Sequence, residues 1–255
     1  MLTDAIVELK GIGKTYETGV DALREVHHAF PAGKLSTLLG PSGCGKTTLL
    51  KIIGGLIAPT TGEVWVKGKR VDGPGADRAF VFQDFALLPW ATVLRNVAFG
   101  LELRGVPKAE RFEVARKFIG EVGLAGFESS YPHQLSGGMR QRVGLARALT
   151  VDADIILMDE PFSSVDEQTR RKFQEDMLDL LRHRQKTVIF VTHSIEEAAY
   201  LSDRIVLLSA RPGTVSQIIQ PNIDRGSKSP DEIRRDKNYL DSVDEIWQVL
   251  KKYLA

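Results

Sequence analysis

The sequence has a single cysteine, no long hydrophobic segment and almost no net charge. Cys44 alone excludes an intrachain disulfide and a metal site built from several cysteines. The apolar runs are shorter than the roughly 20 residues that a membrane-spanning helix needs. Early acids and no long apolar stretch follow Met1, so we expect no signal peptide. The 34 Lys and Arg residues balance 33 Asp and Glu residues, so no global positive field attracts nucleic acid. We therefore expect a soluble globular protein that reaches a membrane only through a partner.

Four short apolar segments, rich in β-branched residues, alternate with helix-like segments, which indicates a mainly parallel sheet wound with helices. These predicted strands are residues 35–39, 79–82, 155–158 and 188–192. Polar or glycine-rich sequence follows each of them directly. Ligands of open α/β sheets bind beyond the carboxyl ends of the strands, so we expect these four segments to meet at one site.

The remaining patterns predict a single α/β domain with three additions to its parallel core. Residues 6–71 alternate apolar and polar positions between turns, which predicts a small antiparallel β portion. Residues 85–149 are predicted to form an inserted helical lobe, in which Thr92 caps one helix and Pro107 opens the next. The core would then comprise residues 1–84 and 150–226.

Residues 227–255 are predicted to form a C-terminal helical tail. Ser229 and Glu232 have the spacing of a capping box at its beginning. One apolar face at helical spacing is expected to dock on the body of the protein. Its members are Leu240, Val243, Ile246, Trp247, Leu250 and Leu254.

A phosphate-binding loop follows the first predicted strand and precedes a helical segment, as the pattern requires. It consists of Gly40, Pro41, Ser42, Gly43, Cys44, Gly45, Lys46, Thr47 and Thr48. Glycines let successive backbone N–H groups face an anion, and the helix N-terminus adds a favourable partial charge. Lys46 is expected to reach the β- and γ-phosphates of a nucleotide, and the Thr47 hydroxyl to ligate Mg²⁺.

Two carboxylates, Asp159 and Glu160, stand at the end of a buried strand. Leaving both unpaired there would cost several kcal/mol, so they require a cation. Asp159 is expected to hold Mg²⁺, and Glu160 to orient and deprotonate the water that attacks the γ-phosphate.

Gln83 and His193 follow the other two strands. By itself each is an ordinary loop residue, and only its position at a strand end favours a function. Gln83 could contact Mg²⁺ and the attacking water, and His193 could bond the γ-phosphate.

The segment of residues 135–142 opens a predicted helix with Ser136, Gly137 and Gly138. It forms a second anion-accepting helix N-terminus in a chain that already has a phosphate loop. One chain thus carries more phosphate-binding surface than one ATP requires. The economical interpretation is a homodimer in which these three residues of each copy close over the ATP held by the other.

These motifs together resemble the ATP-binding cassette (ABC) family over nearly the whole chain. The phosphate loop matches the Walker A motif, residues 155–160 match Walker B, and residues 135–141, which include Gln141, match the signature motif. Gln83 and His193 match the Q-loop glutamine and the switch histidine. The resemblance implies a P-loop NTPase fold and an ATPase that uses ATP and Mg²⁺.

The resemblance assigns roles to two further residues. Tyr16 falls where family members stack an aromatic ring on adenine, although a core tyrosine is an equal alternative at this point. Asp166 ends the segment Ser163-Ser164-Val165-Asp166, which occupies the position of the D-loop that signals across the dimer.

Residues 73–78, 87–90 and 208–213 are similar to the nitrate, sulfonate and taurine importer branch of the family. This implies a peripheral subunit on the cytoplasmic side of the cell membrane, with permease subunits docking between Gln83 and Gly100. A periplasmic solute-binding protein would act indirectly, and nucleic acid is not expected as a partner. The apolar residues of this segment, Phe85, Leu87, Leu88 and Trp90, would receive the permease, but they could equally be core residues.

Two other classes of protein compete with a transport ATPase. Soluble cassette proteins that act on DNA or the ribosome carry a long coiled-coil insertion or two cassettes, and this sequence has neither. A small-molecule kinase with a phosphate loop would leave residues 135–141 without a function.

Substituting Glu160→Gln should preserve ATP binding, nearly abolish hydrolysis and trap a closed dimer, because only the water-activating carboxylate is lost. Steady-state ATPase rates and ATP affinities of the variant and the wild type check this. A turnover within a few-fold of wild type would remove the role assigned to Glu160.

Overall fold

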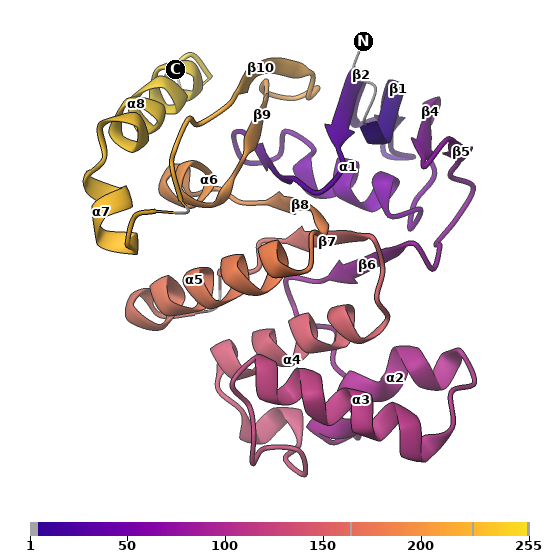
Figure 1. The fold of residues 1–255 in the computed structure, drawn as a ribbon. Coiled ribbons are helices and arrows are strands. Elements are labelled where there is room, and N and C mark those ends of the chain that lie inside the picture. Colours follow the sequence, from indigo (N-terminus) through magenta and orange to yellow (C-terminus); the bar gives the residue numbers. More distant parts are fainter. Residues whose placement is uncertain (1–4, 164, 226, 254–255) are drawn as a thin grey trace. The chain divides into compact units, whose positions relative to one another are not determined.

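The computed structural model describes residues 5–163, 165–225 and 227–253 and divides the chain into two compact units. The first unit combines Met1–Gly75 with Gln185–Ala255, and the second is Ala76–Arg184. Figure 1 shows the path of the chain through its helices and strands. The predicted helical lobe, residues 85–149, lies within the second unit, which also includes two strands and a further helix.

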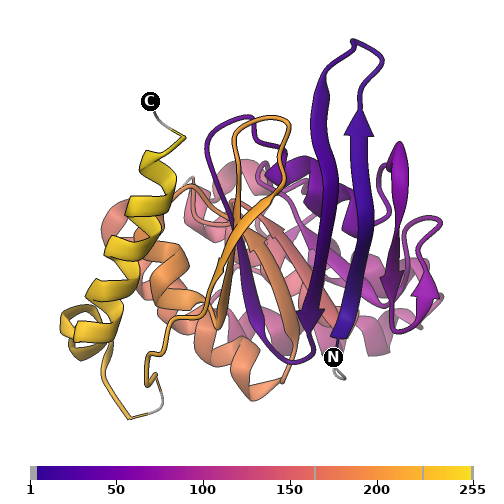
Figure 2. The same ribbon diagram turned by 90° about the horizontal axis from the view of Figure 1, so that it is seen from above.

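The first unit contains a four-stranded antiparallel sheet with the order β2-β1-β4-β5. Its strands are β1 (Ala5–Thr15), β2 (Asp21–Pro31), β4 (Thr61–Val66) and β5 (Lys69–Arg70). Val7 of β1 pairs with Phe30 of β2 on one side and with Val66 of β4 on the other, and all three side chains are buried. The long β1–β2 hairpin is prominent in Figure 2. The predicted antiparallel portion is therefore confirmed.

The parallel strands of the first unit are β3 (Leu35–Leu39), β8 (Thr187–Val191) and β9 (Arg204–Leu208). β3 lies between β8 and β9, and β10 (Val215–Ile219) runs antiparallel to β9. Every residue of β3 and β8 is buried, which explains why both read as continuous apolar runs. Leu38 pairs with Val191, so the segments that follow β3 and β8 leave the sheet at the same edge.

Helix α1 (Lys46–Ile53) follows β3, and α6 (Ile195–Leu201) follows β8. The tail forms α7 (Pro230–Arg235) and α8 (Lys237–Lys251). The predicted capping box is confirmed: the Ser229 backbone N–H donates to Glu232 Oε2 at 2.8 Å, and the Glu232 N–H donates to Ser229 Oγ at 3.4 Å.

The predicted buried face of α8 is partly wrong. Ile246 is buried as expected, but Leu240 and Trp247 are 53% and 46% exposed. The other buried side chains of the helix are Tyr239, Ser242 and Val249. Apolar residues cover two adjacent stripes of this helix, so periodicity alone does not select the stripe that packs. Leu254 lies outside the described residues.

The second unit pairs β6 (Arg78–Val81) in parallel with β7 (Ile155–Asp159), and Val81 lies opposite Met158. Between these strands run α2 (Val93–Leu103), α3 (Lys108–Glu121), the short 3-10 helix η1 (Pro132–Gln134) and α4 (Gly137–Thr150), and α5 (Glu167–His183) follows β7. Thr92 caps α2 as predicted, and its Oγ1 accepts from the Arg95 N–H at 3.4 Å. In the described part of the chain, no helix is long and apolar enough to cross a membrane.

Candidate functional site

The phosphate loop of the first unit closes around the ammonium group of Lys46. Lys46 is the first residue of α1 and is only 8% exposed. Its Nζ donates hydrogen bonds to the carbonyl oxygens of Gly40 at 2.8 Å and Pro41 at 3.0 Å, and lies 3.8 Å from Cys44 Sγ. A buried charge requires such partners. The loop therefore holds a cation at the N-terminus of a helix, an arrangement that fits a phosphate group.

Two glycines of the loop allow a close approach that other residues would prevent. A Cβ at Gly45, which has φ 96°, would lie 2.7 Å from Leu23 Cδ2 and 2.8 Å from the Ala22 carbonyl oxygen. A Cβ at Gly40 would lie 2.8 Å from the Leu208 carbonyl oxygen. The loop is thus packed against β2 and β9, which fixes its path.

Tyr16 lies beside the phosphate loop and is not a core residue. Its side chain is 40% exposed, and its Oη lies 3.0 Å from Thr48 Oγ1, within hydrogen-bonding distance. The Lys14 ammonium lies 5.6 Å from the centre of its ring. An exposed ring at the start of α1 is available for stacking, which removes the core alternative.

His193 follows β8 at the same sheet edge from which the phosphate loop leaves β3. Its side chain is exposed, and Ser194, the next residue, caps α6. Within the first unit, His193 and the phosphate loop therefore lie at the carboxyl ends of paired strands, and Tyr16 lies beside α1.

In the second unit, Gln83 lies just after β6, while Asp159 is the last residue of β7 and Glu160 follows it. Because Val81 pairs with Met158 in parallel register, these residues leave the sheet at one edge. Asp159 is 4% exposed, whereas Gln83 is exposed. Glu160 has φ 45°, a strained conformation for a residue with a side chain, and such strain is concentrated at functional sites.

The oxygen donors predicted for Mg²⁺ fit this ion, which proteins usually hold through one or two carboxylates together with substrate phosphates. These donors are the Thr47 hydroxyl, the Gln83 amide and the Asp159 carboxylate. No group of three or more His, Cys, Asp or Glu side chains forms a metal cage within the described ranges.

The second predicted phosphate-binding element begins α4. Ser136 caps this helix, its Oγ accepts from the Met139 N–H at 3.2 Å, and its side chain is exposed. The helix begins at Gly137, directly after this cap. At this N-terminus Ser136 is exposed and Gly137 is half-buried, whereas Gly138 is buried near Val165 and Thr169. The exposed part of the N-terminus is open to an anion.

Two further predicted site residues of the second unit lie on α4 and at the start of α5. Gln141 is 1% exposed, and its Nε2 lacks a hydrogen-bond partner among the described residues. Asp166 caps α5, and its Oδ1 accepts from the Thr169 N–H at 3.0 Å. Ser164 of the same segment lies outside the described residues.

The sequence did not identify Arg147, which holds the loop after Gln83. Its guanidinium donates to the carbonyl oxygens of Phe85 at 2.7 Å and Ala86 at 2.6 Å, two residues with positive φ. The Arg140 guanidinium lies 5.3 Å from the centre of the Phe85 ring. Arg140 and Arg147 are seven residues apart and so lie on one face of α4, but this spacing does not show what that face contacts. The Q-loop is therefore fastened to α4, the helix that begins with Ser136.

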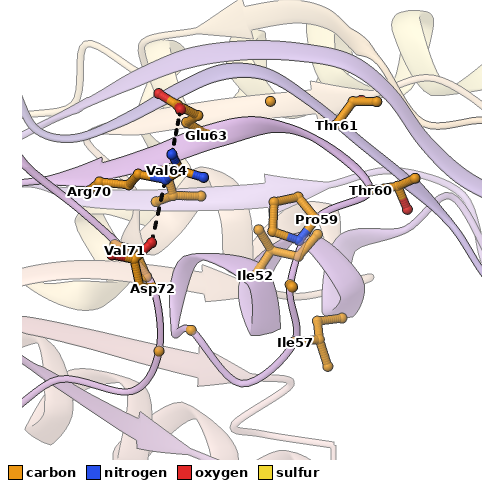
Figure 3. Close-up of a pocket in the computed structure, with 14 residues that line it drawn as sticks. Ile52, Ile57, Pro59, Thr60, Thr61, Glu63, Val64, Arg70, Val71 and Asp72 are labelled. Atoms are coloured by element: carbon orange, nitrogen blue, oxygen red, sulfur yellow. Dashed lines mark ion pairs between the residues drawn. The ribbon is translucent and has the colours of Figure 1, made fainter.

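A cavity of about 300 Å³ lies elsewhere in the first unit (Figure 3). It is lined by the C-terminal end of α1, the following loop and strands β4 and β5, and Arg70 forms ion pairs there with Glu63 at 2.9 Å and Asp72 at 3.4 Å. None of its lining residues belongs to the predicted nucleotide site. The cavity is thus separate from the phosphate loop, at the opposite end of α1.

Comparisons with known proteins support the same interpretation. The model of the ABC transporter family matches residues 23–163. The nitrate import ATP-binding protein NrtD of Synechocystis is 41% identical over 236 residues, 91% of this chain and 89% of the relative. The taurine import ATP-binding protein TauB of Escherichia coli K12 is 44% identical over 225 residues, 87% and 88% of the two chains.

A solved dimeric ATP-binding cassette in a post-hydrolysis state, bound to ADP and phosphate, matches with a TM-score of 0.76. It is 35% identical and covers 84% of this chain and 98% of its own. The chain belongs to the ABC transporter family, in which it is an ATP-binding ATPase subunit. The predicted P-loop NTPase fold class is confirmed.

The buried Cys44 gives a chemical test of the phosphate loop. Burial raises the pKa of its thiol, and the neighbouring Lys46 ammonium opposes this only in part. Alkylation requires the thiolate, so iodoacetamide at pH 7 should label the native chain about tenfold more slowly than the unfolded chain. The native rate should rise with pH until the raised pKa is passed.

Fully labelled native protein should also lose ATP binding, because the adduct occupies the phosphate loop. Mass spectrometry follows the labelling and calorimetry the affinity, with Cys44→Ala as the unlabelled control. Equal labelling rates in the native and unfolded chains, or unchanged affinity after complete labelling, would contradict this account of the loop.

Proposed function

We propose that this chain is the ATP-hydrolysing subunit of a membrane importer for a small solute and works as a homodimer. Lys46 and the loop N–H groups bind the phosphates, and Tyr16 stacks on the adenine. Mg²⁺, held by Thr47, Gln83 and Asp159, would neutralise developing charge on the phosphates. Glu160 accepts the proton of the attacking water, and His193 bonds the γ-phosphate.

The observation that carries the dimer is the presence of two anion-accepting helix N-termini in one chain. Lys46 begins α1 in the first unit, and the exposed Ser136 caps α4 in the second. One ATP uses one such terminus for its phosphates. The similar cassette of known structure is a dimer, which supports a second copy as the source of the other terminus. In this dimer, Asp166 would act through α5, the helix that it caps, and Gln141 through α4, in which it is buried.

Permease subunits would dock on the segment from Gln83 to Gly100. Trp90 in this segment is 70% exposed, and exposed apolar side chains of this size mark interaction sites when they are grouped. The buried Asn96 holds the segment in place, because its amide bonds the backbone of Leu88, Ala91 and Thr92. The subunit would lie on the cytoplasmic face of the membrane, and a solute-binding protein would deliver the cargo from the other side.

The cargo class follows from the similarity to relatives. NrtD is named for nitrate import and TauB for taurine import. Nitrate, a sulfonate, taurine or a related small organic molecule is therefore the proposed cargo.

Mixing two inactive variants tests the shared site. Lys46→Ala removes the phosphate loop function, and Gly137→Asp places a negative charge at the second helix N-terminus. Only a mixed dimer would contain one complete site, from the loop of one variant and the α4 N-terminus of the other. The mixture should regain about a quarter of wild-type ATPase activity, since half of the dimers are mixed and each has one site of two.

Gly137→Asn is the matched control, because it has the same size without the charge and should retain more activity. A mixture as inactive as its components would show that each chain closes over its own ATP.

A further inference from the structure

The turn that carries His193 is held by a network of hydrogen bonds that its neighbours form. Thr192 is 2% exposed, and its Oγ1 accepts a hydrogen bond from the Ser194 N–H at 3.1 Å. This bond from residue i to residue i+2 encloses His193 as the central residue of a Ser/Thr turn. The Thr192 N–H also donates to the Leu38 carbonyl oxygen at 3.4 Å, which ties the turn to β3.

Glu197 completes the network from the first turn of α6. It is 8% exposed, and one of its carboxylate oxygens accepts from Thr192 Oγ1 at 2.5 Å. Its own N–H donates to Ser194 Oγ at 3.2 Å. In an ordinary capping box, the glutamate would accept directly from the N–H of the capping serine. Here the Ser194 N–H donates to the Thr192 hydroxyl, and this hydroxyl donates to Glu197. We call the arrangement of Thr192, Ser194 and Glu197 the relayed capping box.

The carboxylate fixes the direction of the hydroxyl group. An ionised carboxylate only accepts hydrogen bonds, so the Thr192 hydroxyl must donate to Glu197. Its lone pairs are then available to the Ser194 N–H. An amide at position 197 could donate instead and would allow the hydroxyl to turn away from this arrangement.

Stability alone does not explain a buried carboxylate at this place. Burying a carboxylate is costly even when it is hydrogen-bonded, and apolar residues of similar volume often serve stability equally well. What the carboxylate adds is a single geometry for the backbone on both sides of His193.

We propose that Thr192 and Glu197 are positioning residues that set the direction of the His193 side chain through the relayed capping box. The inference rests on the proposed function, in which His193 bonds the γ-phosphate. β8 and β3 are paired in parallel, and the Thr192 bond to Leu38 lies two residues before Gly40. The network therefore fixes the turn of His193 to the strand that leads into the phosphate loop.

Single-turnover ATP hydrolysis and ATP affinity of the full chain test this proposal. Thr192→Val removes the hydroxyl and Glu197→Gln removes the directional constraint. Both should slow hydrolysis by about tenfold or more, because a small misplacement of a positioned group has effects of this size. The ATP dissociation constant should stay within about twofold, since the phosphate loop is unchanged. Thr192→Ser restores the hydroxyl and should restore the rate.

Two matched controls separate positioning from general destabilisation. Thr37→Val removes another buried hydroxyl of the same unit, one bonded to Ser202, and Glu245→Gln neutralises an exposed glutamate on α8. Both should hydrolyse ATP at nearly the wild-type rate. Slowing by Thr37→Val equal to that by Thr192→Val would overturn the proposal.

A double-mutant cycle with His193→Ala gives the decisive comparison. If Thr192 acts through His193, Thr192→Val should have no further effect in the His193→Ala background, so the two effects do not add. Additive effects would overturn the positioning role, and so would a wild-type rate for both Thr192→Val and Glu197→Gln. If His193→Ala itself hydrolyses ATP at the wild-type rate, the role of His193 in the proposed function fails instead.

Discussion

The structure of the nucleotide site depends on one buried positive charge. The Lys46 ammonium lies inside the phosphate loop, where the carbonyl oxygens of Gly40 and Pro41 accept its hydrogen bonds. For the loop to reach this geometry, β3 must end at Leu39, α1 must begin at Lys46, and glycine must occupy positions 40 and 45. The charge is stabilised by the same backbone that a phosphate would contact. The loop therefore holds a positive charge where an anion would bind, and burying this charge lowers the stability that the loop would otherwise have.

Parallel strand pairing extends this arrangement to the other candidate residues. In the first unit, the pairing of β3 with β8 places His193 at the edge where the phosphate loop begins. In the second unit, the pairing of β6 with β7 brings Gln83, Asp159 and Glu160 to one edge of that strand pair. Helix caps then set the local geometry: Ser194 begins α6 after His193, and Ser136 begins α4. The chemistry of the site therefore follows from where strands end and helices begin.

The sequence predicted the strands well because their apolar runs are short, β-branched and bounded by polar residues. It also predicted the caps at Thr92 and Ser229, since capping depends on residues close in the chain. It failed where packing decides between similar patterns, as for Trp247, which is exposed on a helix with two apolar stripes.

Hydrogen bonds between distant segments were also beyond the sequence. Arg147 reaches the carbonyl oxygens of Phe85 and Ala86, 62 and 61 residues away, and no local pattern specifies such a contact. Glu197 was missed for a different reason, since its bond to Thr192 spans five residues but its burial depends on the fold. Motifs of contiguous residues were therefore visible in the sequence, whereas the residues that hold them in place were not.

The most direct test of the account is the stability of Lys46→Met with and without magnesium ATP, followed by thermal and chemical unfolding. Methionine fills a similar volume without a charge, so the nucleotide-free variant should match or exceed the wild-type stability to within about 1 kcal/mol. Magnesium ATP should raise the Tm of the wild type and leave that of the variant unchanged. A variant that loses several kcal/mol without nucleotide, yet still gains stability from ATP, would show that the Lys46 ammonium serves the fold and not the phosphate.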